Sequence, residues 1–272
     1  MKHRNLLIAS AALLALPVWA VAPGHASRRQ KNIFRGVNYA HRGLHSRDRE
    51  VPENSLTAFR MAAREGYGIE LDVQLSRDGK VVVFHDSTLD RVCGVHAKVE
   101  DLSWEELRKL RLCGTDERIP LFTEVLASIG GCEALIVELK NGSRNRELCE
   151  KTCAQLADYR GNVCIESFNP MIVAWFRFHA RDLVRGQLAT TLKDYRTDRI
   201  VWPAAVLLHN TMLNFLARPQ FIAYRIGYRP PLVRLCTALG ALNVGWTSHE
   251  PRNEKGRDAV IFEFYRPRQR YL

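Results

Sequence analysis

Two acidic residues, Glu70 and Asp72, stand two positions apart inside a run of residues that is otherwise mostly apolar. Residues two apart in a strand share a face, so both carboxylates point to one side while Ile69, Leu71 and Val73 point to the other. Two carboxylates about 4 Å apart repel by roughly 4 kcal/mol at an effective dielectric of about 20. Burial makes their ionisation costlier still. The pair therefore predicts a bound positive charge.

A third acid, Glu138, repeats this pattern inside the apolar run Ala134–Leu139, and Lys140 follows on the same face. Three carboxylates with no softer ligand suit a hard divalent cation such as Mg²⁺ or Ca²⁺. Salt bridges to Arg42 and Lys140 are the alternative, but three acids against two bases leave an excess of negative charge. We therefore expect the three acids to bind a metal ion.

Two histidines each end a short apolar run that is followed by a turn. His41 ends the run Val37–Ala40, and His85 ends the run Val81–Phe84. The carboxyl ends of strands in a parallel barrel gather on one face, where loops build active sites. Two imidazoles, a metal ion and cationic side chains that hold an anion together predict metal-assisted cleavage of a phosphate ester. We interpret five further histidines as surface or hydrogen-bonded residues without a catalytic role: His45, His96, His179, His209 and His249.

The elements that must position these side chains indicate an α/β fold. Their apolar runs are typical of strands buried on both faces of a parallel sheet. The 272 residues suffice for one barrel of about 250 residues. Only twelve residues separate Asp72 from His85, too few for a usual crossover helix, so the barrel is expected to be irregular there. Residues 87–122 are expected to form an excursion on the catalytic face.

Six short motifs follow one another between Tyr39 and Lys140. They are His41-Arg42-Gly43, Pro52-Glu53-Asn54-Ser55, Glu70-x-Asp72, Asp78-Gly79, His85-Asp86 and Glu138-x-Lys140. In this order and spacing they resemble the glycerophosphodiester phosphodiesterase family. Weaker similarity continues through Glu166-Ser167-Phe168, Gln187-Leu188 and Trp246-Thr247. The sequence departs from the family pattern at Ser76, in its long loop Leu44–Val51, and at Ser248-His249 after the Trp-Thr pair.

The resemblance implies a distorted (β/α)8 TIM-type barrel of the phosphatidylinositol-phospholipase-like kind, with a small excursion after the third strand. It also implies a phosphoric diester hydrolase that converts glycerophosphodiesters to glycerol phosphate and an alcohol. The roles that it implies are metal binding by Glu70, Asp72 and Glu138, acid and base catalysis by His41 and His85, and phosphate binding by Arg42 and Lys140. Glu53 is expected beside this group, as a further ligand or as a brace. Trp246 belongs either to the core or to the pocket of the leaving group.

Two other functions remain open. A phospholipase D-like phosphodiesterase acting on lysophospholipid or another membrane lipid would use the same site. A catalytically inactive barrel used as a binding scaffold would lack a ligand or a histidine, and none is missing. The net charge of +11 fits anionic substrates or lipid headgroups. No nucleic acid is expected, because the sequence has no recognition-helix, zinc-spacing or paired-aromatic strand motif.

Residues 1–30 are predicted to form a signal anchor or signal peptide, ahead of a barrel domain in residues 31–272. An uncharged stretch of 17 residues, Leu6 to Ala22, lies at the boundary between the length of a signal-peptide core and that of a spanning helix. Pro23 follows the small-x-small sequence Ala20-Val21-Ala22 and disfavours cleavage. We therefore expect this segment to remain as a helix that holds the protein at a membrane.

The side of the membrane is indicated by charge and by cysteines. Basic residues flank the far end of the hydrophobic stretch more densely than its start, which favours a cytoplasmic catalytic domain. Seven cysteines are an odd number for a disulfide framework and suit free thiols in a reducing compartment. A secreted or periplasmic location is the alternative. The alcohol headgroup, the metal, the acid and base roles of the two histidines, the oligomeric state and any protein partner remain open.

Overall fold

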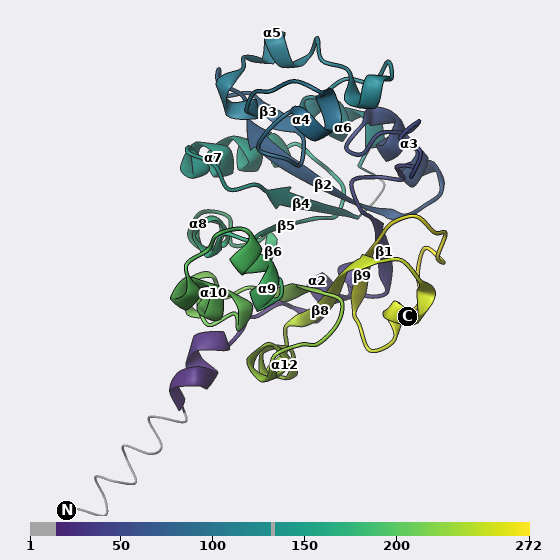
Figure 1. The fold of residues 1–272 in the computed structure, drawn as a ribbon. Coiled ribbons are helices and arrows are strands. Elements are labelled where there is room, and N and C mark those ends of the chain that lie inside the picture. The colour runs from purple at the N-terminus through teal and green to yellow at the C-terminus, as the bar shows by residue number, and fades with distance from the viewer. Residues whose placement is uncertain (1–14, 132–133) are drawn as a thin grey trace, which may run out of the picture.

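The computed structural model describes residues 15–131 and 134–272, and within them eight parallel strands close into a barrel (Figure 1). The strands are β1 (Val37–Ala40), β2 (Gly68–Leu75), β4 (Leu135–Leu139), β5 (Val163–Ser167), β6 (Val184–Ala189), β7 (Phe221–Arg225), β8 (Leu242–Ser248) and β9 (Ala259–Phe262). Each pairs with the next, and β1 closes the barrel by pairing with both β9 and β2. The predicted TIM-type barrel is confirmed.

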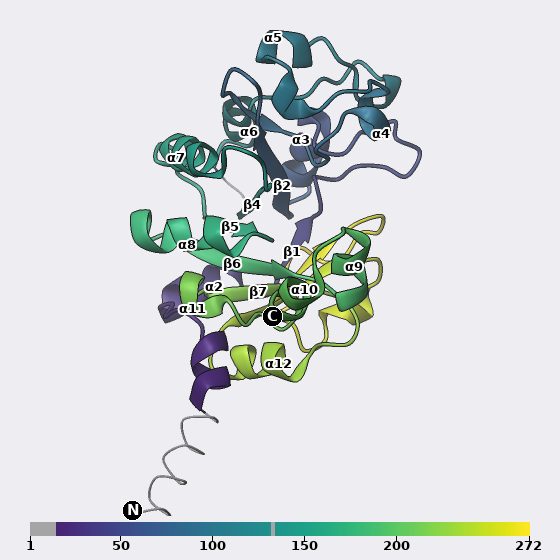
Figure 2. The same cartoon turned by 60° about the vertical axis from the view of Figure 1, so that its left-hand side comes forward.

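Helices cover the outside of the barrel (Figures 1 and 2). They are α3 (Leu56–Arg64), α6 (Phe122–Ile129), α7 (Asn145–Leu156), α8 (Pro170–His179), α9 (Leu192–Thr197), α10 (Trp202–His209), α11 (Asn214–Ala217) and α12 (Pro231–Ala238). A further helix, α2 (Arg28–Phe34), precedes β1 and begins with a capping box in which the Ser27 hydroxyl accepts from Gln30 N–H. Phe34 at its end packs with apolar side chains from seven of the barrel strands.

Side chains of the strands alternate between the helices and the barrel interior. Ile69, Leu71 and Val73 of β2 pack in one core cluster with residues of the covering helices. A second cluster joins apolar residues of β1 and β4 to β9, which fill the interior. Glu70 and Asp72 lie on the inner side because they alternate with the helix-facing residues of β2. The structure therefore confirms that the two acids share the face of β2 opposite its apolar residues.

The connection after β2 is irregular, as the short spacing predicted. The strand β3 (Val81–Val83) turns back and pairs antiparallel with β2 instead of joining the barrel. Beyond it lie α4 (Asp90–Cys93), η1 (Val99–Asp101), α5 (Trp104–Leu107) and η2 (Leu112–Gly114), at the top of both overall views. This excursion has its own small apolar core, to which Val82, Leu89 and Leu107 belong.

The described part of the predicted leader contacts the barrel. Residues 15–21 are helical, the side chain of Val21 is fully buried, and the Arg218 guanidinium donates to the Trp19 and Ala22 carbonyls at 2.9 Å. Among the described helices, none has the length and apolar character needed to span a bilayer. Residues 1–14 lie outside the described residues. The membrane anchor, its orientation and the domain boundary at residue 30 therefore stay predictions.

Candidate active site

Strand register brings four carboxylates together inside the barrel. Asp72 of β2 pairs with Glu138 of β4, which pairs in turn with Glu166 of β5. Glu70 stands two residues before Asp72 and therefore shares its face. All four side chains are buried. Ligand oxygens of Glu70, Asp72 and Glu138 lie within 4.8 Å of one another, so the three predicted metal ligands do converge.

Two cationic side chains enter this cluster. The Lys140 ammonium donates to Glu138 Oε1 at 2.8 Å and to Asp72 Oδ1 at 3.2 Å. The Arg42 backbone N–H donates to Glu70 Oε2 at 3.0 Å, and its guanidinium Nε lies 3.4 Å from Asp72 Oδ2. Burial opposes the charge of Asp72, but Lys140, His85 and Arg42 together lower its pKa well below the usual range. Asp72 is therefore ionised at neutral pH.

The rest of the cluster is short of positive charge. Burial, with the charges of Asp72 and Glu138 added, raises the pKa of Glu70 well above its usual value. Burial and the same two neighbours also raise the pKa of Glu166 well above its usual value, and its Oε2 has no hydrogen-bond partner among the described residues. Four buried carboxylates thus face two cationic side chains. An oxygen-lined group with this charge deficit fits a hard divalent cation.

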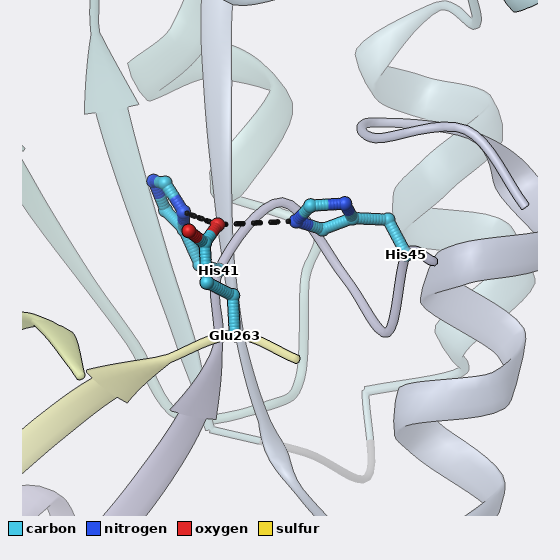
Figure 3. Close-up of side chains that lie close together, drawn as sticks. All are labelled: His41, His45 and Glu263. Carbon is cyan, nitrogen blue, oxygen red and sulfur yellow. Dashed lines mark hydrogen bonds and ion pairs between the residues drawn. The ribbon is translucent and has the colours of Figure 1, made fainter. Parts of the chain in front are cut away.

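His41 meets its partner where β1 ends beside β9. Ala40 pairs with Phe262, so the residues that follow them, His41 and Glu263, leave neighbouring strands at the same edge. His41 Nδ1 lies 3.0 Å from Glu263 Oε2, and Figure 3 shows the ring turned toward this carboxylate. Burial, and next the charge of Arg42, lower the pKa of His41 to about 4. At neutral pH the ring is therefore neutral.

These states of His41 and Glu263 determine the position of the ring proton. Burial opposes the charge of Glu263, but the hydrogen bond from His41 and the nearby imidazole of His45 lower its pKa below the usual range. An ionised carboxylate only accepts hydrogen bonds, so His41 Nδ1–H donates to it. The His41 Nε2 lone pair is consequently available to accept a proton.

His85 is positioned by the hairpin of β2 and β3. The Phe84 backbone N–H donates to the Asp72 carbonyl at 3.0 Å, and the Gln74 amide donates to the carbonyls of Phe84 and Asp86 at 2.7 and 2.9 Å. The His85 Nδ1 atom lies 2.6 Å from Asp86 Oδ1. The charge of His85 contributes to the low pKa of Asp72, which is consistent with its location beside the acid cluster.

A sequence model of the Glycerophosphoryl diester phosphodiesterase family matches residues 41–264. The chain belongs to this family. It is 31% identical over 235 residues to human glycerophosphodiester phosphodiesterase 1, covering 76% of this chain and 70% of the human protein. It is 42% identical over 113 residues to a glycerophosphodiester phosphodiesterase of Caldanaerobacter subterraneus subsp. tengcongensis, covering 38% of this chain and 44% of the relative. That second match therefore spans less than half of the relative.

Solved structures of similar proteins share the barrel. A phosphodiesterase of Oleispira antarctica, solved in complex with the product sn-glycerol-3-phosphate, superposes with a TM-score of 0.69 at 23% identity and covers 85% of this chain and 94% of its own. A glycerophosphodiester phosphodiesterase of Thermotoga maritima gives a TM-score of 0.59 at 26% identity, with coverages of 83% and 93%. Family membership confirms the predicted enzyme class, a phosphoric diester hydrolase.

In this family member Glu53 braces the site and does not reach the acid cluster. Its carboxylate accepts from Arg42 at 2.7 Å and from two nitrogens of Arg91 at 2.7 Å each, and Arg91 also donates to Asp86 at 2.6 Å. Burial opposes ionisation, but Arg91 and Arg42 lower the pKa of Glu53 to about 2. Of the two roles expected for Glu53, bracing fits these contacts.

Trp246 has core contacts and also lines a cavity, while its place in a leaving-group pocket stays a prediction. Its indole Nε1–H donates to the Ala223 carbonyl at 3.1 Å, and its ring packs edge-on against Phe168 at 5.7 Å. The same side chain lines an open cavity of about 600 Å³, which Glu263 also lines. Because Glu263 contacts His41, this cavity adjoins the histidine.

Three residues were present in the motifs or apolar runs without being assigned a role. The Asn54 amide donates to Asp72 Oδ2 at 2.8 Å, while the next residue, Ser55, caps α3. Glu166 and Glu263 each interrupt or end an apolar run, which is the signal that found Glu70 and His41. Of the two interpretations of His45, the surface one is wrong, because its side chain is only 9% exposed and lies 3.4 Å from Glu263.

Proposed function

We propose that this protein hydrolyses glycerophosphodiesters to glycerol phosphate and an alcohol with the help of a divalent cation. The convergence of three buried carboxylates beside two histidines at the strand ends carries this proposal. Glu70, Asp72 and Glu138 would hold the cation, which supplies Lewis-acid charge for a phosphate oxygen. The Oleispira antarctica relative, which binds sn-glycerol-3-phosphate as its product, supports a substrate that contains glycerol phosphate.

The cationic side chains of the chain suit a phosphodiester. The guanidinium of Arg42 and the ammonium of Lys140 both reach into the acid cluster and both are largely buried, at 15% and 18% exposure. Their charge makes up for part of the carboxylate excess and attracts an anionic phosphate into the same space. Their fixed contacts to Asp72 orient them before the substrate arrives.

We assign the proton transfers from the protonation state of His41. His41 is neutral and its Nε2 lone pair is free, so it accepts the proton of the attacking hydroxyl, whether of water or of the glycerol moiety. His85 then donates a proton to the leaving alcohol. A base that must be unprotonated and an acid that must be protonated give a bell-shaped dependence of the rate on pH.

The test is turnover of defined substrates by the purified full-length chain. Glycerophosphocholine, glycerophosphoethanolamine and glycerophosphoinositol are compared with lysophosphatidylcholine, each with Mg²⁺, with Ca²⁺ and with EDTA. We expect metal-dependent release of glycerol phosphate from at least one of the first three. Turnover of the lysolipid alone would favour the phospholipase D-like alternative, and no turnover at all would favour a binding scaffold.

Two substitutions connect this activity to the acids. Glu70→Gln and Asp72→Asn keep size while removing charge, and each should abolish metal-dependent turnover with the fold retained by circular dichroism. Glu105→Gln is the matched control, because the Glu105 side chain is 69% exposed in the excursion. Activity retained in both site variants would disprove the proposed metal site.

A further inference from the structure

Beside the oxygen-lined site lies a carboxylate that is surrounded by imidazoles. Glu263 Oε2 is 3.0 Å from His41 Nδ1 and 3.4 Å from His45 Nε2, and Figure 3 shows both rings directing a nitrogen toward it. A third imidazole nitrogen, His249 Nε2, lies 3.8 Å from Glu263 Oε1. The potential ligand atoms of His41, His45 and Glu263 all lie within 4.8 Å of one another.

One ring nitrogen of His45 lacks a hydrogen-bond partner in this cluster. Its side chain is 91% buried, and Nε2 has no hydrogen-bond partner among the described residues although the Glu263 carboxylate is near. A buried polar atom left without a partner costs free energy. The Phe264 ring packs edge-on against His45 at 4.9 Å and stacks on His249 at 6.2 Å, so the aromatic contact holds both imidazoles beside Glu263.

We propose that His41, His45 and Glu263 form a second metal site, one that binds Zn²⁺ or a similar borderline transition metal, with His249 as a further ligand. Imidazole nitrogens with one carboxylate are ligands that Zn²⁺ prefers, whereas Mg²⁺ and Ca²⁺ prefer oxygen. The acid cluster offers oxygen only. Two neighbouring sites in this chain therefore select different classes of cation.

Zinc at the second site inhibits turnover, a consequence that rests on the proposed function. The metal takes the lone pair of His41 Nδ1, so the one ring proton of neutral His41 moves to Nε2. That nitrogen then has no lone pair with which to accept the proton of the attacking hydroxyl. No net proton is gained or lost by the ring in this exchange. Mg²⁺ at the acids and Zn²⁺ at the histidines thus act in opposite directions.

Binding is tested on the full-length chain by titration with Zn²⁺ against a chromophoric chelator, with Mg²⁺ in large excess to fill the oxygen site. We expect the wild type to bind one Zn²⁺ and His45→Ala to bind it at least about tenfold more weakly. His45→Gln keeps bulk and polarity and replaces His45→Ala if that variant is poorly folded. We expect it to lose the same Zn²⁺ affinity. His96→Ala is the matched control, since the His96 side chain is 99% exposed in the excursion.

Three results would overturn the site: no Zn²⁺ bound by the wild type, equal affinity in both His45 variants, or loss of Zn²⁺ binding in Glu70→Gln, which would place the ion at the acids. The activity readout is turnover measured over a range of Zn²⁺ concentrations, relative to turnover without Zn²⁺. The Zn²⁺ concentration that gives half-maximal inhibition should rise in His45→Ala by the same factor as the Zn²⁺ affinity falls. Zinc binding that depends on His45 in a protein without turnover would refute the proposed function and leave the site standing.

Discussion

The His41–Glu263 and His85–Asp86 pairs make the same contact in different surroundings. In each, the ring Nδ1 lies within hydrogen-bond distance of a carboxylate, at 3.0 Å and 2.6 Å. The first pair joins residues that are 222 positions apart, and its side chains are 16% and 17% exposed. The second joins neighbours in the sequence, and its side chains are 31% and 23% exposed.

The two carboxylates differ in what else they bind. Asp86 also accepts from Arg91, which is itself held by Glu53, so part of its charge is compensated by a guanidinium. Glu263 is approached by imidazoles, and its contacts to a second and a third ring are longer, at 3.4 and 3.8 Å. In the proposed mechanism, Glu263 would stabilise positive charge on His41 after proton transfer, while Asp86 would mainly orient His85.

The largest expected effect separates the two histidines by the chemistry of the leaving group. His41→Ala and His85→Ala should each lower kcat for a glycerophosphodiester of an ordinary alcohol by about 10²- to 10⁴-fold. With a glycerophosphodiester of 4-nitrophenol, the leaving group needs no proton, so the loss in His85→Ala should shrink toward wild type. The loss in His41→Ala should persist. Steady-state kinetics on both substrates measures these losses. A loss that shrinks in His41→Ala and persists in His85→Ala would make His41 the acid and His85 the base.

A smaller effect is expected when the carboxylates are neutralised. The charge of Glu263 raises the pKa of His41 against the effect of burial, so Glu263→Gln should lower this pKa below about 4. A weaker base accepts protons less readily, and we expect kcat near neutral pH to fall at least about tenfold. The acid limb of the kcat/KM profile should also move to lower pH.

Asp86→Asn is the matched comparison for Glu263→Gln. It removes the same charge from the other pair but leaves the surroundings of His41 intact, so the acid limb should stay where it is in the wild type. If both substitutions move the acid limb equally, the distinction between the two pairs fails. If neither substitution moves the acid limb, the pKa that this limb reflects does not belong to His41.

Much of the site was readable from the sequence because its members are local. Alternation within β2 placed Glu70 and Asp72 on one face, and the run around Glu138 repeated that pattern, so the oxygen cluster followed from strand periodicity. Asp86 was adjacent to its histidine. The register that sets Asp72 against Glu138 and Glu138 against Glu166 depends on sheet pairing, which periodicity does not specify.

The missed contacts depend on closure of the barrel. Glu263 reaches His41 only because β9 returns to pair with β1, and the sequence between them contains no spacing that reports this pairing. His45 does not end an apolar run as His41 and His85 do, and its ring contact is with Phe264, another residue after β9. Long-range pairing therefore decides which histidine gains which partner.

The smallest effect concerns stability and tests the Glu53 brace, which binds Arg91 on the His85 side and Arg42 next to His41. Glu53 has its pKa lowered from an ordinary 4.5 to about 2, so its charge stabilises the folded protein above pH 4.5, and this contribution is lost as the pH falls toward 2. Glu53→Gln should lower the free energy of unfolding at pH 7 by up to about 3 kcal/mol. The difference from wild type should shrink between pH 4.5 and pH 2.

Urea unfolding of wild type and Glu53→Gln at pH 7, 4 and 3 measures this difference, with Glu105→Gln as the exposed control. A difference that stays constant over this range would assign the contribution of Glu53 to packing and not to its charge. Arg91 would then remain bound to Asp86 without support from a second acid. In that case the positive charge that compensates Asp86 would come from the Arg91 guanidinium alone. The His85–Asp86 and His41–Glu263 pairs would then be more alike than their surroundings indicate.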